Sequence, residues 1–249
     1  MRVEQYLRNS ARRFASRIAV VAGRRSHTYA ELDRQSDRFA AALAGQGVRP
    51  GDTVATFLDD SLPAVVAAFG ILKAGAILAP FDAGAEASTL AAWLAAEGAV
   101  GIVTEARLAT RAAEALVTAP SVRFVILSGG DRALAGGSCL AFEEIVGRIG
   151  VPAIVPHIDH DAAAVVFARE AVEADRYTHA EIAAAATLGQ PSEHATIDAV
   201  PPLSGYDGFH CLVGTIAAGA TQMLDGRPAG RAGTVRIATP PRRRMSLAG

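Results

Sequence analysis

Lysine is almost absent from this sequence of 249 residues: among its 24 lysine and arginine residues, only Lys73 is a lysine. Any mechanism that requires a lysine therefore has one candidate in the chain. Cysteine is also scarce, because Cys139 and Cys211 are the only two and lie far apart. Two distant cysteines do not make a disulfide framework, so we expect small buried side chains in a reducing compartment rather than reactive thiols.

A strong charge of either sign and a long uninterrupted apolar run are missing as well. The formal net charge is −1, which excludes a global field that would attract nucleic acid or an anionic membrane. Residues 1–17 are charged throughout, which argues against a signal peptide. The longest apolar run, 63–81, contains Lys73 and Gly75, and a buried helix, turn and strand explain it better than a membrane span. We therefore expect a cytoplasmic protein without nucleic-acid or membrane partners.

About half of the residues are apolar (51%), which is enough for a sizeable core. Apolar segments of strand length alternate with segments of helical spacing. Strands are predicted within 18–23, 49–60, 76–83, 100–106, 122–129 and 163–168. Helices are predicted within 4–16, 24–48, 61–75, 86–99, 107–119, 141–149 and 178–189. The second helix follows a turn, with Thr28 as its N-cap and Glu31 completing a capping box. This alternation is typical of an α/β fold with a mostly parallel sheet flanked by helices.

The composition predicts one folded unit and a tail. We interpret residues 1–226 as a single subdomain, within which 129–160 is a connecting segment rich in glycine, alanine and proline. The tail 227–249 is rich in arginine, proline and glycine and is predicted to be flexible. Residues 157–161, "HIDHD", have metal-binding side chains, but without a further ligand pair we expect polar surface groups and no metal site.

Three phrases, in this order, resemble the adenylate-forming superfamily, which comprises acyl-CoA synthetases, aryl-acid ligases and the adenylation domains of nonribosomal peptide synthetases. They are "HTYAELDRQSDRFAAALAGQGVRPGDTVA" (27–55), "GILKAGAILAPFD" (70–82) and "LAAWLAAEGAVGIVTEA" (90–106). The resemblance extends from about Tyr6 to about Leu224 and implies the first part of the family's large N-terminal domain. By resemblance, the family reaction joins a carboxylate to the α-phosphate of ATP with Mg²⁺ and passes the acyl group to CoA or a carrier-protein thiol.

The family's phosphate loop is altered in this sequence. The pattern is a Ser/Thr/Gly run followed by Pro-Lys-Gly, between a strand ending in IxYT and a helix beginning THxN. The flanks are recognisable here, but the connection is about three residues shorter and has no glycine or lysine. Glycines allow consecutive N–H groups to converge on phosphate oxygens, and carboxylates repel them. We expect a solvated helical turn or surface loop whose arginines pair with adjacent acids, although an anion site built on those arginines stays open. The residues at this position are Ala168, Arg169, Glu170, Glu173, Asp175, Arg176, Thr178 and His179.

The family's acyl-binding motif, LPLFHxxG, is altered too. The matching stretch "PPLSGYDGF" places Ser204 and Gly205 at the Phe-His pair and keeps Gly208. Tyr206 and Phe209 either line an apolar groove or, as we expect, pack in a core or interface. Lys73 lies in the "LKAG" turn, where we expect its charged head to reach water. No residue is therefore assigned a catalytic role, and no cofactor is expected.

These departures predict a catalytically inactive homologue that acts as an interaction or regulatory partner in acyl- or aryl-acid activation or assembly-line biosynthesis. The alternatives are a binding module for an acyl, aryl or nucleotide ligand, one half of a split AMP-dependent acyl-CoA ligase, and a gene without a selected function. Members of the family carry a second sheet subdomain and a lid, which we expect to be missing here. The apolar segment 210–224 would then face water, and we predict that a homodimer or another protein, such as a full-length ligase or carrier protein, covers it.

Overall fold

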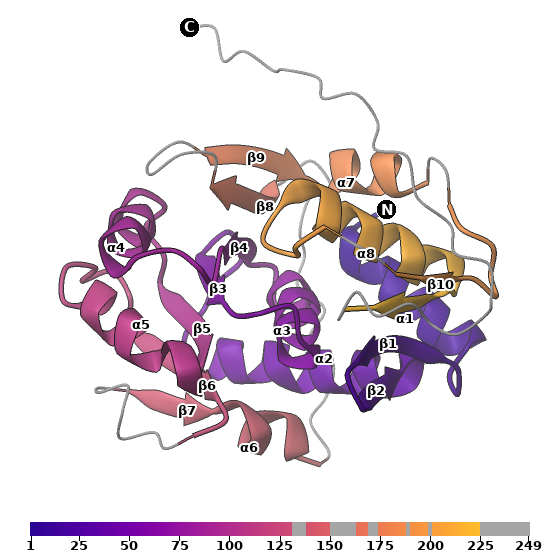
Figure 1. The fold of residues 1–249 in the computed structure, drawn as a ribbon, viewed down its shortest axis with the longest axis horizontal. Coiled ribbons are helices and arrows are strands. Elements are labelled where there is room, and N and C mark those ends of the chain that lie inside the picture. The colour runs from indigo at the N-terminus through magenta and orange to yellow at the C-terminus, as the bar shows by residue number, and fades with distance from the viewer. Residues whose placement is uncertain (131–137, 150–162, 169–173, 188–189, 199–200, 225–249) are drawn as a thin grey trace, which may run out of the picture.

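A computed structural model describes residues 1–130, 138–149, 163–168, 174–187, 190–198 and 201–224 (Figure 1). The predictions for the tail 227–249, for the histidine-rich run 157–161, and for Arg169, Glu170 and Glu173 lie outside the described residues.

The larger of two sheets has seven strands and is parallel except at one edge. Its strands, in spatial order, are β7 (Cys139–Ala141), β6 (Phe124–Ser128), β5 (Gly101–Glu105), β3 (Thr53–Phe57), β4 (Ile77–Phe81), β8 (Ala163–Ala168) and β9 (Ala174–Thr178). In the centre, Ala55 lies opposite both Ala79 and Ile102. Only β9 runs antiparallel to its neighbour, β8. The predicted α/β fold with a mostly parallel sheet is confirmed.

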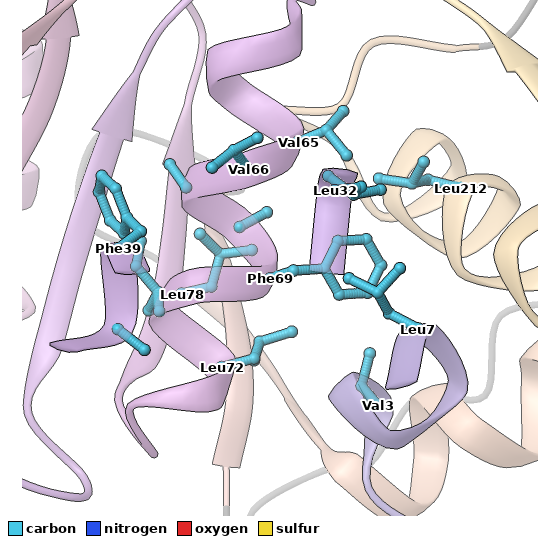
Figure 2. Close-up of a cluster of buried hydrophobic side chains, with 14 of the residues drawn as sticks. Val3, Leu7, Leu32, Phe39, Val65, Val66, Phe69, Leu72, Leu78 and Leu212 are labelled. Atoms are coloured by element: carbon cyan, nitrogen blue, oxygen red, sulfur yellow. The ribbon is translucent and has the colours of Figure 1, made fainter. Parts of the chain in front are cut away.

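Helices cover both faces of this sheet, as the apolar runs of its strands require. One face packs against α2 (Tyr29–Gly45), α3 (Leu62–Lys73) and α6 (Phe142–Gly147). The other face packs against α4 (Ala87–Ala96) and α5 (Ala109–Leu116), and the short 3₁₀ helix 106–108 precedes α5. The helix α3 is apolar all round, and Figure 2 shows its Phe69 pointing toward Leu7 of the amino-terminal helix, while Val66 and Leu72 lie among the neighbouring core side chains.

The smaller sheet has four strands, in the order β10 (Thr196–Ile197), β11 (Thr221–Met223), β1 (Ile18–Ala22) and β2 (Arg25–Thr28). We predicted a turn where β2 forms, and the sequence "RSHT" shows no apolar alternation that would indicate a strand. The backbone of this segment pairs antiparallel with β1 through a tight turn at Gly23, which has φ +60°. The predicted cap is confirmed, since the Thr28 hydroxyl accepts the Glu31 N–H at 3.2 Å.

The remaining helices, α1 (Val3–Arg13), α7 (His179–Ala186) and α8 (Tyr206–Ala218), pack on one another beside the sheets (Figure 1). The expectation that residues 210–224 face water is wrong. The core of α8 is buried within the chain, the Ser10 hydroxyl donates to Ile216 O at 2.7 Å, and the Tyr29 hydroxyl donates to Ala220 O at 2.6 Å. The amino-terminal helix thus covers the segment that we expected a partner to cover. The homodimer or protein complex stays a prediction, but an exposed segment 210–224 no longer supports it.

Within the described part of the chain, none of the helices has the length and apolar character that crossing a bilayer requires.

Candidate functional site

Ligands of open parallel sheets bind at the carboxyl ends of the strands, and acidic residues occupy that edge here. Asp59 and Asp60 follow β3, Asp82 follows β4, and Glu105 ends β5. These three strands are neighbours in the sheet, so their carboxylates gather on one edge. Sequence reasoning did not single them out, although an acid directly after each of three predicted strands was a visible signal.

The environment of these carboxylates is electrostatically unfavourable for further negative charge. Burial, together with the charges of Asp59 and Asp82, raises the pKa of Asp60, while a hydrogen bond from the Leu203 N–H at 3.0 Å lowers it. Burial and the neighbouring Asp59 likewise raise the pKa of Glu105. Arg107 is the cation that the structure pairs with this edge, through Glu105 at 2.9 Å and through Asp59. Among the described residues, Arg107 pairs with two of the four carboxylates, and Arg111 lies beside the same edge, where it donates to Ala83 O at 3.1 Å.

The position of the phosphate loop lies between β8 and β9, which pair antiparallel. Ala168 ends β8 opposite Ala174, and Asp175 and Arg176 lie in β9 rather than in the helical turn or loop that we expected. The open edge of β8 explains the difference, because backbone groups paired with a strand need no helical turn. Among the described residues, Arg176 pairs with an acid that is distant in the sequence: its Nη2 lies 2.5 Å from Oε2 of Glu97, at the end of α4.

Thr178, which ends β9, and His179, which begins α7, make contacts that hold helices in place. Thr178 caps α7, and its hydroxyl accepts the Glu181 N–H at 3.1 Å, as the predicted helix start requires. His179 has 1% of its surface exposed, and its Nδ1 accepts the Val3 N–H from α1 at 3.3 Å. Burial, and then the positive charges of Arg2 and the amino terminus, lower the pKa of His179 to about 4. A neutral histidine bound to α1 is not a phosphate ligand.

A small cavity lies at the position of the acyl-binding motif. Ser204 and Phe209 line it together with Asp60, and its volume is about 20 Å³. That volume holds about one water molecule, whereas pockets for drug-sized ligands have roughly 300–1,000 Å³. Gly205 is the N-cap of α8 and provides no side chain at the place of the family's histidine.

The aromatic side chains of this motif belong to the core. Phe209 is 1% exposed and contacts Phe167, which supports the packing alternative. Tyr206 lies against Tyr177, with ring centroids 4.5 Å apart, and against His210 at 5.6 Å. These contacts support the packing alternative for both side chains.

Gly208 is required by the close approach of the backbone. A Cβ at this position would lie 2.2 Å from the carbonyl oxygens of Pro201 and Pro202. The chain before α8 therefore crosses directly over the helix. The glycine that matches the family motif is explained by this crossing without any ligand.

Lys73 is buried, contrary to the expectation that its head reaches water. Its side chain has no exposed surface, and its Nζ lies 2.5 Å from Asp33 Oδ1 and 2.9 Å from Asp37 Oδ1. It also donates to Asp33 O at 2.8 Å, while Arg8 approaches Asp37 at 3.2 Å. The reason is that the last turn of α3 packs on α2, whose Asp33 and Asp37 share one face at i, i+4 spacing. The single lysine of the sequence is thus occupied in holding two helices together.

Comparison with known proteins gives one family. A family model described as "AMP-binding enzyme" matches residues 7–168, more than half of the chain. Phosphinothricin tripeptide synthetase PhsC of Streptomyces viridochromogenes is 43% identical over 105 residues, which are 42% of this chain and 10% of that protein. The salicyl-AMP ligase / salicyl-S-ArCP synthetase of Mycobacterium tuberculosis is 32% identical over 168 residues, covering 63% of this chain and 29% of that protein.

Among solved structures, apo MbtA of Mycobacterium smegmatis superposes with a TM-score of 0.81 at 29% identity. The match covers 91% of this chain and 44% of that one. The chain therefore spans less than half of the length of each of these relatives.

Proposed function

Since this chain belongs to the AMP-binding enzyme family, we propose that it is a member that does not itself adenylate a carboxylic acid, and that it serves as an interaction or regulatory partner in acid activation. The observation that carries this proposal is the hairpin at the phosphate-loop position, whose sequence 168–176 has no glycine and no lysine. A phosphate cradle needs converging backbone N–H groups, a conformation that glycine permits and that alanine, valine and glutamate rarely adopt.

The charges at the edge support the same conclusion. A triphosphate at the carboxyl ends of β3, β4 and β5 would meet Asp59, Asp60, Asp82 and Glu105 with Arg107 as the counter-charge. Two like unit charges about 4 Å apart repel by about 4 kcal/mol at an effective dielectric constant near 20. Arg176 offers no compensation, because Glu97 already holds its guanidinium.

Two further features weigh against the alternatives. The cavity of about 20 Å³ beside Ser204 is too small for an acyl or aryl group, which disfavours a ligand-binding module. One half of a split ligase would still need the phosphate cradle that belongs to this half, and Lys73 is not free to replace a catalytic lysine. An interaction role with a full-length ligase or a carrier protein fits a retained scaffold whose reactive positions are altered. The relatives named as a salicyl-AMP ligase and a tripeptide synthetase support a role in acid activation or assembly-line biosynthesis.

ATP–pyrophosphate exchange tests the proposal directly. The purified chain is assayed with aryl, fatty and amino acids, with a full-length salicyl-AMP ligase as the positive control. We expect no exchange above background and no saturable binding of MgATP. Exchange that depends on one of the acids would refute the loss of catalysis.

The interaction role has its own test. Adding the chain in excess to a full-length ligase encoded near it should change the rate of exchange by that ligase. An unchanged rate, together with a monomer in light scattering of the mixture, would refute an interaction or regulatory role while leaving the loss of catalysis in place.

A further inference from the structure

The first turn of α1 depends on a histidine from a distant part of the chain. The first N–H groups of a helix have no partner within the helix, and Val3 is the first residue of α1. His179, which is 176 positions away in the sequence, provides its Nδ1 as the acceptor for the Val3 N–H at 3.3 Å. The hydroxyl of Tyr6 makes a second tie between the same helices, to Ala183 O at 3.2 Å.

This hydrogen bond fixes the protonation state of the imidazole. A ring nitrogen that accepts a hydrogen bond carries no proton, so neutral His179 has its proton on Nε2. The same Nδ1 lies 3.7 Å from Oε2 of Glu4, which is buried and lacks a hydrogen-bond partner among the described residues. His179 Nδ1 and Glu4 Oε2 are therefore two acceptors that face each other. A proton on Nδ1 would attract the Glu4 carboxylate and repel the Val3 N–H.

We propose that His179 is an acid-sensitive cap of helix α1: unprotonated, it holds the first turn of α1 against α7, and protonation at Nδ1 breaks the bond to Val3 and releases that turn. The helix end adds to the effect, since a positive charge at a helix N-terminus opposes the helix dipole. This inference does not depend on whether the chain adenylates a substrate.

Several charged groups act on the pair. Arg2, the N-cap of α1, contacts Glu4 at 2.9 Å, and the charges of Arg8 on α1 and of Lys73 on α3 also lower the pKa of Glu4. Burial is the larger effect and raises the pKa of Glu4 above its ordinary value. Burial, Arg2 and the amino-terminal ammonium lower the pKa of His179 to about 4.

The two groups affect stability in opposite directions as the pH falls. Unfolded His179 takes up a proton near pH 6.5, whereas the folded form stays neutral to about pH 4, so stability is lost between these values. Glu4 binds its proton more readily in the folded than in the unfolded state, so its protonation stabilises the folded state on acidification. The free energy of unfolding therefore contains both contributions, so the test must observe the hydrogen bond between the Val3 N–H and His179 Nδ1 directly.

The experiment follows the imidazole nitrogens of His179 and the amide of Val3 by NMR in the full chain, from pH 7 to pH 3.5. At neutral pH we expect an unprotonated Nδ1 and a slowly exchanging Val3 amide. As His179 titrates, hydrogen exchange of Val3 should accelerate about five- to tenfold relative to the intrinsic rate, which corresponds to the loss of one helix cap. A protonated Nδ1 at neutral pH, or Val3 protection that does not change while His179 titrates, would overturn the proposal.

Two substitutions separate this cap from simple packing. In His179→Asn the amide oxygen takes the place of Nδ1 and does not titrate, so Val3 protection should persist to low pH. In His179→Leu the acceptor is lost, and Val3 should exchange fast at every pH. If His179→Asn shows the same acid-dependent release as the wild-type chain, another group is responsible and the inference fails. The wild-type nitrogen spectra decide the question even where His179→Leu does not fold.

Discussion

Replacement of Lys73 by methionine measures what the buried cation contributes. Lys73 has no exposed side-chain surface, while Asp33 and Asp37 keep 23% and 17% of theirs. Removing one partner of a buried ion pair costs about 3–5 kcal/mol, because it leaves an uncompensated charge. Water reaches both carboxylates in part, and Arg8 still neutralises Asp37 at 3.2 Å. We therefore expect Lys73→Met to lower the free energy of unfolding by about 2–4 kcal/mol.

Urea unfolding, followed by the fluorescence of the buried Trp93 and by far-UV circular dichroism, provides the measurement. Arg12→Met is the matched control, since it removes an exposed cation from a helix and should change stability by less than about 0.5 kcal/mol. Asp33→Asn in the Lys73→Met background should restore part of the loss, with a coupling energy of about 1–3 kcal/mol in the double-mutant cycle.

The two possible positions of the lysine head give different results. If the Lys73 ammonium group were in water, Lys73→Met would change stability as little as Arg12→Met does. A coupling energy near zero between Lys73 and Asp33 would also indicate an ammonium group in water. Either result would refute the buried triad of Lys73, Asp33 and Asp37 and, with it, the argument that this lysine is unavailable for chemistry.

Two further substitutions test the packing of α8 on its surroundings. Gly208→Ala would place a Cβ 2.2 Å from the carbonyl oxygens of Pro201 and Pro202 and should cost about 1–3 kcal/mol in urea unfolding. Gly205→Ala, whose Cβ would lie 3.6 Å from Pro202 O, should cost less, because only the N-cap preference for glycine over alanine is lost. Equal losses would contradict the crossing. Tyr29→Phe removes the hydroxyl that donates to Ala220 O at 2.6 Å in the core, so the free energy of unfolding, measured by thermal unfolding, should fall by about 1–2 kcal/mol. Tyr206→Phe is the control, and an equal loss in both variants would contradict this hydrogen bond.

The central strands were predictable because their sequences are apolar and bounded by turns. The segments that became β3, β4, β5, β6 and β8 are buried on both faces and read as apolar runs. The strands β2 and β9 lie at sheet edges, and their sequences "RSHT" and "ADRYT" give no such signal. Backbone pairing with an existing neighbour forms these strands, and that neighbour is not visible in the local sequence.

The candidate site was predictable only where a local pattern was altered. The loss of glycine and lysine between 168 and 176 is visible in the sequence alone, but the pairing of Arg176 with Glu97 is not, because it depends on the position of α4. The burial of Lys73 had a partial signal in the spacing of Asp33 and Asp37. Reading it required knowing that α2 packs on α3. The contact of His179 with Val3 joins residues 176 positions apart in the sequence and has no local signal.

The positions that match the family pattern and those that depart from it have different surroundings in this structure. Thr28, Lys73 and Thr178 match the pattern, and each holds a helix, by capping α2, by joining α3 to α2, or by capping α7. The departures fall at the hairpin after Ala168 and at Ser204 and Gly205, where family members would contact phosphate or an acid. Substitution at the first group would be costly to the fold, since removing one partner of a buried ion pair leaves an uncompensated charge. Retention of the first group with loss of the second is what a scaffold kept for its surface would show.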